Sequence, residues 1–148
     1  MKFPYGISDF QSIIEEQYFY IDRTDRIAFI EKAGKQLLFL RPRRFGKSLL
    51  MSMLENYYDV AKSEQFDSLF GHLAIGKNPT PMHNKFFVLS WDFSVVSPAG
   101  DIEEIRQNLH RYINSRMHNF IVLYQKMLPI KIEIEPTDAF VTFQSIRR

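Results

Sequence analysis

The fold is predicted from one stretch, Gln36-Leu-Leu-Phe-Leu-Arg-Pro-Arg-Arg-Phe-Gly-Lys-Ser-Leu-Leu-Met-Ser-Met-Leu54. Its apolar residues 37–40 predict a short parallel strand that is buried on both faces. A strongly basic loop follows and ends at Gly46-Lys47-Ser48. The apolar residues after the loop recur at helical spacing and predict a helix to about Val60. Strand, loop, Gly-Lys-Ser and helix follow one another in the order of a P-loop, the Walker A motif.

The chemistry of this order favours a phosphate site. The start of a helix exposes unpaired N–H groups and carries a partial positive charge, so an anion is stabilised there. Gly46 lets the backbone approach a phosphate oxygen, because a Cβ would intrude. Lys47 is expected to reach the β- and γ-phosphates of ATP, and the Ser48 hydroxyl is expected to hold Mg²⁺. The predicted nucleotide-binding residues are Arg43, Arg44, Phe45, Gly46, Lys47, Ser48 and Leu49.

The loop departs from the Walker A pattern at its first glycine, whose position Arg41 occupies. Pro42 follows, and it has no N–H to donate to a phosphate. Arg43 and Arg44, together with Arg41, supply guanidinium donors whose planar geometry suits phosphate. The alternative interpretation is a basic turn at an ordinary helix start, with Ser48 near the cap.

Several stretches resemble the AAA-ATPase-like family, whose modified P-loop also lacks the first glycine. They are Leu40-Arg-Pro-Arg-Arg-Phe-Gly-Lys-Ser-Leu49, Pro4-Tyr-Gly-Ile-Ser-Asp-Phe10, Tyr20-Ile-Asp-Arg-Thr24 and, more loosely, Val88-Leu-Ser-Trp-Asp-Phe-Ser94 and Asp138-Ala-Phe-Val-Thr-Phe-Gln144. The likeness covers nearly the whole chain and implies an ATP-binding module. Longer members of the family often carry a C-terminal PD-(D/E)XK nuclease-like domain, which implies an effector domain as a partner in the full-length protein.

The pattern as a whole predicts an α/β fold of the P-loop NTPase type with a parallel sheet. A second strand is predicted at Phe86-Phe-Val-Leu-Ser-Trp-Asp-Phe93. Residues 1–34 are predicted to form an N-terminal helical extension, and residues 35–148 a partial P-loop domain. This sheet is incomplete, because no Walker B strand or later strand follows. A parallel pair alone is unstable, so the chain is interpreted as the N-terminal piece of a longer protein.

Polar cap residues mark the other predicted helices. Ser8 is expected to cap a short first helix, and Asp22 and Thr24 offer caps for a second one. A long helix is predicted to begin at Ser97 or at Asp101. The remaining predicted elements are an edge strand or extended loop at 130–135 and a final helix at 137–146.

An acidic residue and a run of three aromatic residues are further candidates for the site. Asp92 follows a run of mostly apolar residues, at the end of the second predicted strand, and is similar to a Walker B aspartate, which holds Mg²⁺ or its water. Complete relatives carry a later strand that ends in an acidic cluster, so the resemblance places Asp92 near the site and not as the main metal acid. Tyr18, Phe19 or Tyr20 could stack on a nucleotide base, but packing against the first helix is favoured.

Composition narrows the class of protein. With 45% hydrophobic and 15% aromatic residues, the chain has enough apolar surface for a core. The formal net charge of +2 does not support nucleic-acid binding. Such binding remains an alternative only because basic residues cluster in the 41–47 loop. The absence of cysteine excludes a disulfide framework and a thiolate metal site. No apolar run is long enough to span a bilayer and no signal peptide is evident, so no membrane association and a cytoplasmic location are expected.

Three functional interpretations remain open from the sequence. The first is an ATP-binding, ATPase-type module that uses Mg²⁺ and switches a neighbouring effector domain. This chain alone is then expected to bind nucleotide weakly and without efficient turnover, because no Walker B acid can be assigned. The second is a non-catalytic module whose 41–47 loop binds either the phosphate backbone of a nucleic acid or an acidic partner. The third is a fragment that does not fold fully and has no function alone.

Overall fold

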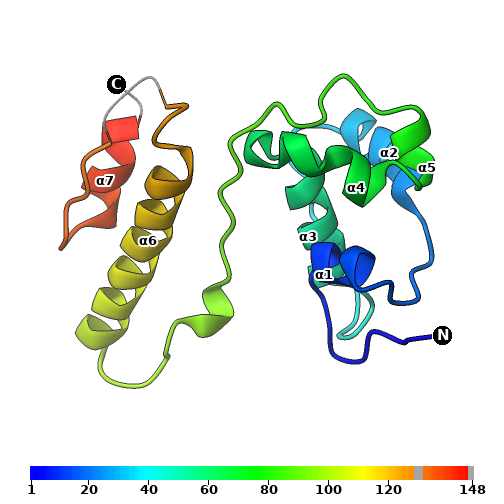
Figure 1. Ribbon diagram of the computed structural model, residues 1–148. Coiled ribbons are helices and arrows are strands. Elements are labelled where there is room, and N and C mark those ends of the chain that lie inside the picture. Colours follow the sequence, from blue (N-terminus) through cyan, green and yellow to red (C-terminus); the bar gives the residue numbers. More distant parts are fainter. Residues whose placement is uncertain (129–131, 147–148) are drawn as a thin grey trace. The chain divides into compact units, whose positions relative to one another are not determined.

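The computed structural model describes residues 1–128 and 132–146, and the chain forms two compact units, Met1–Phe87 and Val88–Arg148. Helices and irregular segments make up both units (Figure 1). The described residues contain two isolated β-bridges, Lys2 with Tyr18 and Asp59 with Phe86, and no β-strand. The prediction of an α/β fold with a parallel sheet is therefore wrong. The predicted boundary at residue 34 stays a prediction.

The helices of the two units follow from the caps and the apolar spacing. The N-terminal unit contains α1 (Phe10–Glu15), η1 (Thr24–Arg26), α2 (Ile27–Lys32), α3 (Lys47–Tyr58), η2 (Val60–Gln65), α4 (Phe66–Phe70) and α5 (Ala74–Lys77). The C-terminal unit contains η3 (Phe93–Val95), α6 (Ile102–Tyr124) and α7 (Ala139–Ile146). None of the helices formed by described residues has the length and hydropathy needed to cross a lipid bilayer.

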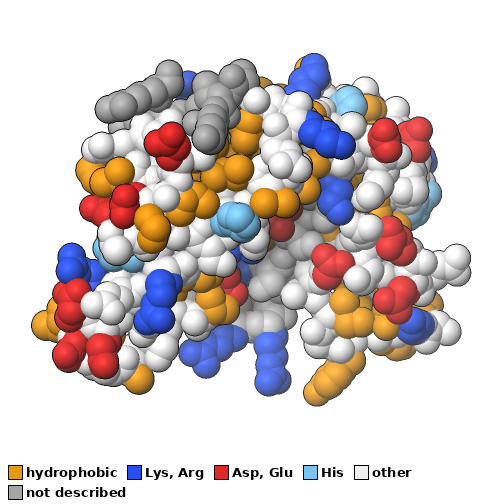
Figure 2. Space-filling model, turned by 60° about the vertical axis from the view of Figure 1, so that its left-hand side comes forward, with side chains coloured by type: hydrophobic (Ala, Val, Ile, Leu, Met, Phe, Trp, Pro, Cys, Tyr) orange, Lys and Arg blue, Asp and Glu red, His pale blue; other side chains and the backbone are white. Residues whose placement is uncertain are grey.

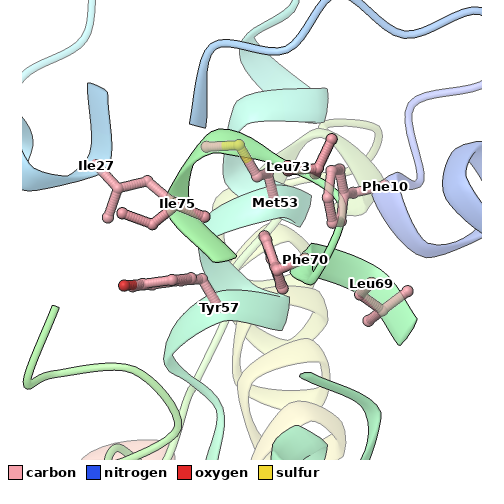
Figure 3. Packing of buried hydrophobic residues seen from close by; sticks show 8 residues of the cluster. All are labelled: Phe10, Ile27, Met53, Tyr57, Leu69, Phe70, Leu73 and Ile75. Atoms are coloured by element: carbon pink, nitrogen blue, oxygen red, sulfur yellow. The ribbon is translucent and has the colours of Figure 1, made fainter. Parts of the chain in front are cut away.

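The core of the N-terminal unit is built around α3. Figure 3 shows the eight buried residues that gather there, Phe10, Ile27, Met53, Tyr57, Leu69, Phe70, Leu73 and Ile75. The ring of Phe70 stacks on Phe10 at 5.0 Å and meets Tyr57 edge-on at 5.4 Å between centroids. Complete burial of one such side chain contributes about 1.5–3 kcal/mol. The helix predicted after Gly46 is confirmed, and its apolar face holds this unit together.

A polar bridge joins α1 to α3. Asp9 caps α1, because its carboxylate accepts a hydrogen bond from the Ser12 N–H at 2.7 Å. The other carboxylate oxygen accepts from the Ser52 hydroxyl of α3 at 3.2 Å, and that hydroxyl accepts from the Phe10 N–H at 2.9 Å. The first helix was predicted correctly, but its cap is Asp9 and not Ser8.

A second polar bridge ties the segment before α2 to the start of α5. The Asp22 carboxylate accepts hydrogen bonds from the N–H and hydroxyl of Thr24 and from the Ala74 N–H. Thr24 is completely buried, and its hydroxyl oxygen accepts from the Ile75 N–H at 3.1 Å. These bonds satisfy two backbone donors at the N-terminus of α5, which has no intrahelical partners for them.

Residues 37–40 do not form the predicted strand. Leu37, Leu38, Phe39 and Leu40 are 53%, 82%, 48% and 78% exposed. A parallel strand is stable only when neighbouring strands pair with it and both of its faces are covered. No described segment pairs with residues 37–40, so their apolar character alone does not produce a strand.

Residues 86–93 do not form the predicted second strand either. From Val88 to Asp92, side chains of α6 form hydrogen bonds with backbone groups of this segment. The Tyr124 hydroxyl accepts from the Val88 N–H at 3.0 Å, and the Arg116 Nε donates to the Ser90 carbonyl at 3.1 Å. The N–H of Asp92 donates to the Tyr112 hydroxyl. The three side chains come from one ridge of α6, where residues four or eight apart share a face. Part of the backbone of residues 88–92 is therefore hydrogen-bonded to side chains of a helix and not to a neighbouring strand.

The long helix of the C-terminal unit begins with a capping box at Asp101, the second of its two predicted starts, and not at Ser97. The Asp101 carboxylate accepts from the Glu104 N–H at 2.8 Å, and the Glu104 carboxylate accepts from the Asp101 N–H at 3.1 Å. Of the predicted edge strand or extended loop at 130–135, residues 130 and 131 lie outside the described residues, and 132–135 form no strand. The final predicted helix is confirmed as α7.

We expect Thr24→Val to destabilise the chain by about 2 kcal/mol, because it leaves the buried Ile75 N–H without its acceptor. Thr24→Ser retains the hydroxyl and is the matched control, with a smaller loss from the missing methyl group. Denaturant unfolding of the full chain measures both changes. Equal stability of the Val and Ser variants would show that this hydrogen bond contributes nothing.

Acid should weaken the bridge at Asp22. Partial burial alone would raise the pKa of Asp22, but hydrogen bonds from Thr24 and Ala74 outweigh it and hold the pKa below its ordinary value of 3.8. The stabilisation is therefore complete above 3.8 and is lost as the pH falls through the lower folded-state pKa.

The measurement is thermal unfolding of the wild type and Asp22→Asn between about pH 6 and about pH 3. The wild type should be the more stable protein at the higher pH, and the difference should shrink on acidification. Glu64→Gln serves as the control, because Glu64 is exposed and makes no described hydrogen bond. A difference that does not change with pH would contradict this role of the Asp22 carboxylate.

Candidate functional site

The basic loop enters α3 through two residues with left-handed backbone conformation. Arg44 has φ 67° and Gly46 has φ 74°. A residue other than glycine loses roughly 1–2 kcal/mol in this conformation, so Gly46 relieves strain that Arg44 retains. A Cβ placed on Gly46 would meet no atom within 4 Å, which leaves open space beside the backbone at the start of the helix.

The N-terminus of α3 keeps donors free for an anion. Gly46 is its N-cap residue and offers no side chain to the first N–H groups of the helix. The Gly46 carbonyl accepts the first helical hydrogen bond, from the Leu50 N–H at 2.9 Å. A twelve-residue helix with an uncapped start carries a partial positive charge at that end.

Lys47 closes the loop on itself. Its ammonium group donates to the Arg41 carbonyl at 2.7 Å, across six residues of chain. Residues 41–48 are all exposed, so this bond lies in water and contributes little to stability. The lysine can therefore exchange this carbonyl for a stronger acceptor at small cost.

A cavity of about 380 Å³ lies beside this helix start, within the N-terminal unit. Its lining residues come from the segment before α2, from α2, from the loop and from α3, and they are Tyr20, Ile21, Arg23, Arg26, Ile30, Phe39, Arg41, Phe45, Gly46, Leu49, Leu50 and Met53. Eight of them carry apolar or aromatic side chains and three are arginines. None of the described residues that line the cavity is acidic. The cavity therefore suits a ligand that is partly apolar and partly anionic.

Two of the three arginines have partners close by. The Arg41 guanidinium lies 5.4 Å from the centre of the Phe39 ring, and the Arg26 guanidinium lies 5.6 Å from that of Phe29. Such contacts orient a cation without neutralising it. Arg26 also pairs with Asp25 at 3.3 Å, in an exposed ion pair of small value.

Tyr20 forms part of the cavity wall and also packs against α1. Its ring meets Phe10 edge-on at 5.6 Å, which confirms the predicted packing of this aromatic residue on the first helix. Its hydroxyl donates to the Met53 sulfur at 3.5 Å, and a thioether is a weak acceptor. Burial, with help from the Asp22 charge, raises the pKa of Tyr20 to about 12. The hydroxyl is therefore a neutral donor at every physiological pH.

The predicted nucleotide-binding residues divide into two groups. Phe45, Gly46 and Leu49 line the cavity. The other four, Arg43, Arg44, Lys47 and Ser48, are exposed in the same loop and helix start without lining it. Their roles in binding stay predictions.

Asp92, the second predicted metal ligand, belongs to the C-terminal unit. Its carboxylate accepts from the hydroxyl and N–H of Ser94, and these hydrogen bonds lower the pKa of Asp92. They cap η3 and occupy the carboxylate locally. The part of the chain that the structure describes holds no group of three or more His, Cys, Asp or Glu residues placed to bind a metal. A role for Asp92 in binding Mg²⁺ stays a prediction.

A second cavity, of about 510 Å³ in the C-terminal unit, differs from the cavity beside Gly46 because its lining contains both acidic and basic residues. That cavity is lined by Glu103, Arg106, Gln107, His110, Arg111, Pro136 and Thr137. Arg106 donates to both carboxylate oxygens of Glu103, at 2.9 and 3.0 Å. Acidic and basic side chains are also interspersed over the face shown in Figure 2. The absence of acidic residues from the lining beside Gly46 is thus a local feature and not a result of the net charge of +2.

The fold and the site together define a helical protein. A cavity with three arginines in its lining lies at the start of the helix that begins within Gly-Lys-Ser. The chain belongs to the AAA-ATPase-like family, since the family model described as "Predicted AAA-ATPase" matches residues 4–146. It is also similar to the "Uncharacterized protein in vnfD 5'region" of Azotobacter chroococcum mcd 1, with 38% identity over 58 residues. The matched part covers 38% of this chain and 11% of that protein. No solved structure matches the chain.

Arg23 and Arg26 line the cavity, but the sequence did not predict them as part of the site. Both lie well before the loop in the chain, and no spacing rule connects them to Gly46. Asp22 and Thr24, which flank Arg23, were interpreted as helix caps, and their bonds to α5 have no signature in the sequence. The three-dimensional proximity of the segments alone brings these arginines to the cavity.

The loop geometry predicts opposite effects of two substitutions. Gly46→Ala should destabilise the chain by about 1 kcal/mol through its left-handed backbone, since no atom obstructs the added Cβ. Arg44→Gly, at a similar φ, should be neutral or slightly stabilising, because glycine adopts this conformation freely. Denaturant unfolding of both variants measures the difference. Equal losses in the two variants would mean that this backbone geometry is not maintained in solution.

Proposed function

We propose that the N-terminal unit binds a nucleoside triphosphate, ATP in the first place, with the triphosphate at the start of α3. The observation that carries this proposal is the cavity beside Gly46, with eight apolar or aromatic residues, three arginines and no acidic residue in its lining. A nucleotide combines a flat, largely apolar base with a polyanion, which are the two properties that such a lining selects. Membership of a family described as "Predicted AAA-ATPase" supports the same ligand.

In this proposal, two groups of lining residues have complementary tasks. The free N–H groups at the start of α3 and the neighbouring arginines favour the phosphates. The apolar side chains of Ile30, Leu50 and Met53 favour the base. The cavity volume of about 380 Å³ lies in the range of small-molecule sites.

Binding requires Lys47 to leave the Arg41 carbonyl and turn toward the phosphates. An exposed bond to a neutral carbonyl is weaker than a bond to a phosphate oxygen, so the exchange is favourable. The loop that this bond closes is free to adjust once the lysine has moved. In this proposal the Lys47 ammonium holds the loop closed when no nucleotide is bound and contacts the phosphates in the complex.

Mg²⁺ would enter with the nucleotide. This ion is held in such sites by one or two protein ligands and by the phosphates, and it keeps several waters. The exposed Ser48 hydroxyl, two residues after Gly46, is the protein ligand that we propose. Mg²⁺ would neutralise part of the phosphate charge. Hydrolysis and the switching of an effector domain would be properties of a larger protein.

One observation favours the alternative function of a non-catalytic phosphate-backbone or acidic-partner binder. Arg43 and Arg44 are exposed, do not line the cavity, and make no described hydrogen bond or ion pair. Guanidinium groups on an exposed loop suit the backbone of a nucleic acid. Such binding falls steeply with salt and does not respond to ATP, whereas nucleotide binding in the cavity competes with ATP.

Titration calorimetry with Mg²⁺-ATP tests the proposal on the full chain. Lys47→Ala should weaken ATP binding at least tenfold, because a charge-assisted bond to phosphate is worth about 1.5–3 kcal/mol. The control is Lys35→Ala, which removes an exposed lysine that does not line the cavity. Unchanged ATP affinity in the Lys47 variant would overturn the assignment. Binding of single-stranded DNA that ATP does not displace would favour the alternative.

A further inference from the structure

We propose that Arg23 is a ligand-contacting residue of this site, where its guanidinium binds the phosphate groups of the nucleotide together with the loop. The inference rests on the proposed nucleotide function and extends it to a segment outside the Gly-Lys-Ser region. Three observations support it: where Arg23 lies, how its backbone is held, and which charges surround it.

Arg23 lines the same cavity as Gly46 and Arg41, although the sequence separates it from both by the whole of α2. The cavity thus has one wall from the 41–46 loop and α3 and another from the segment that contains Tyr20 and Arg23. A ligand in the cavity is contacted from both walls.

The backbone of Arg23 is held between two anchored neighbours. On one side, the Asp22 carboxylate accepts from the Ala74 N–H at 2.7 Å and from the Thr24 N–H at 2.8 Å. On the other side, the buried Thr24 hydroxyl accepts from the Ile75 N–H at 3.1 Å. Both anchors connect the segment to α5. The side chain of Arg23 therefore extends from a fixed backbone, so no backbone freedom is lost when the guanidinium binds an anion.

The charge of Arg23 has no counter-charge among the described residues. The Arg23 carbonyl accepts from the Arg26 N–H at 3.1 Å, but the Arg23 side chain makes no described hydrogen bond, ion pair or ring contact. The two acidic residues nearest in sequence are engaged elsewhere, Asp22 with the donors of Thr24 and Ala74, and Asp25 with Arg26 at 3.3 Å. A cavity whose lining holds three arginines and no acidic residue, with only Arg26 paired to a carboxylate, repels cations and concentrates anions.

Arginine suits a polyphosphate better than lysine at such a position. Its planar fork donates two parallel hydrogen bonds to one phosphate group, and it stays charged at every pH of interest. The expected ligand is a nucleoside diphosphate or triphosphate, whose chain of phosphates is long enough to meet both walls. A nucleoside monophosphate would offer a single group for the two walls to share.

The experiment measures binding of two probes, Mg²⁺-ATP and inorganic tripolyphosphate, to the full chain. Arg23→Gln should weaken binding of both probes about tenfold, equivalent to about 1.4 kcal/mol, and Arg23→Lys should lose less. Lys85→Gln is the charge-matched control, because Lys85 is exposed and does not line the cavity. The unfolding midpoint of Arg23→Gln should equal that of the control, since the Arg23 side chain makes no described hydrogen bond, ion pair or ring contact.

The outcomes separate this inference from the function on which it rests. If the wild type binds ATP and Arg23→Gln binds it equally well, Arg23 is not a ligand contact, while the nucleotide function stands. If Arg23→Gln weakens ATP but not tripolyphosphate, the phosphate assignment is wrong. If the wild type binds neither probe, both proposals fall together.

Discussion

The burial of one face of α3 is the constraint on which the N-terminal unit depends. Met53 and Tyr57 pack into the aromatic core with Phe10 and Phe70. An isolated helix of this length is marginal in water, so tertiary burial and not intrinsic propensity keeps α3 folded. Because a helix is stiff, packing of its second half also determines where its first turn lies. The position of Gly46 beside the cavity is therefore a consequence of the core.

Helices were predicted well and strands were not, for one physical reason. A helix such as α3 or α6 closes its hydrogen bonds within itself, so local spacing and a capping box such as that at Asp101 are sufficient signals. A strand needs partners from elsewhere, and apolar residues do not reveal whether those partners exist. Residues 37–40 find none among the described residues, and residues 88–92 are bound by side chains of α6.

The candidate site shows the same division between local and distant information. The left-handed glycine and the exposed helix start follow from the residue order around Gly46, which is why the loop could be predicted. Arg23 reaches the cavity only because Asp22 and Thr24 attach its segment to α5. Hydrogen bonds from side chains to backbone amides far away in the chain produce no recurring pattern in a sequence, so they cannot be predicted from residue spacing. The second wall of the site therefore had to come from the structure.

The ridge of α6 that binds residues 88–92 has an evolutionary consequence. Tyr112, Arg116 and Tyr124 contact main-chain atoms of the segment and leave its side chains out of the hydrogen bonding. Amino-acid identity at residues 88–90 can consequently drift while the attachment persists, except that proline would delete the anchoring amide at Val88. Trp91 and Asp92 are constrained further, because the Trp91 ring contacts Tyr112 and the Asp92 carboxylate accepts from Ser94. Along residues 88–90, the helix ridge and not the segment that it holds should bear the selective pressure.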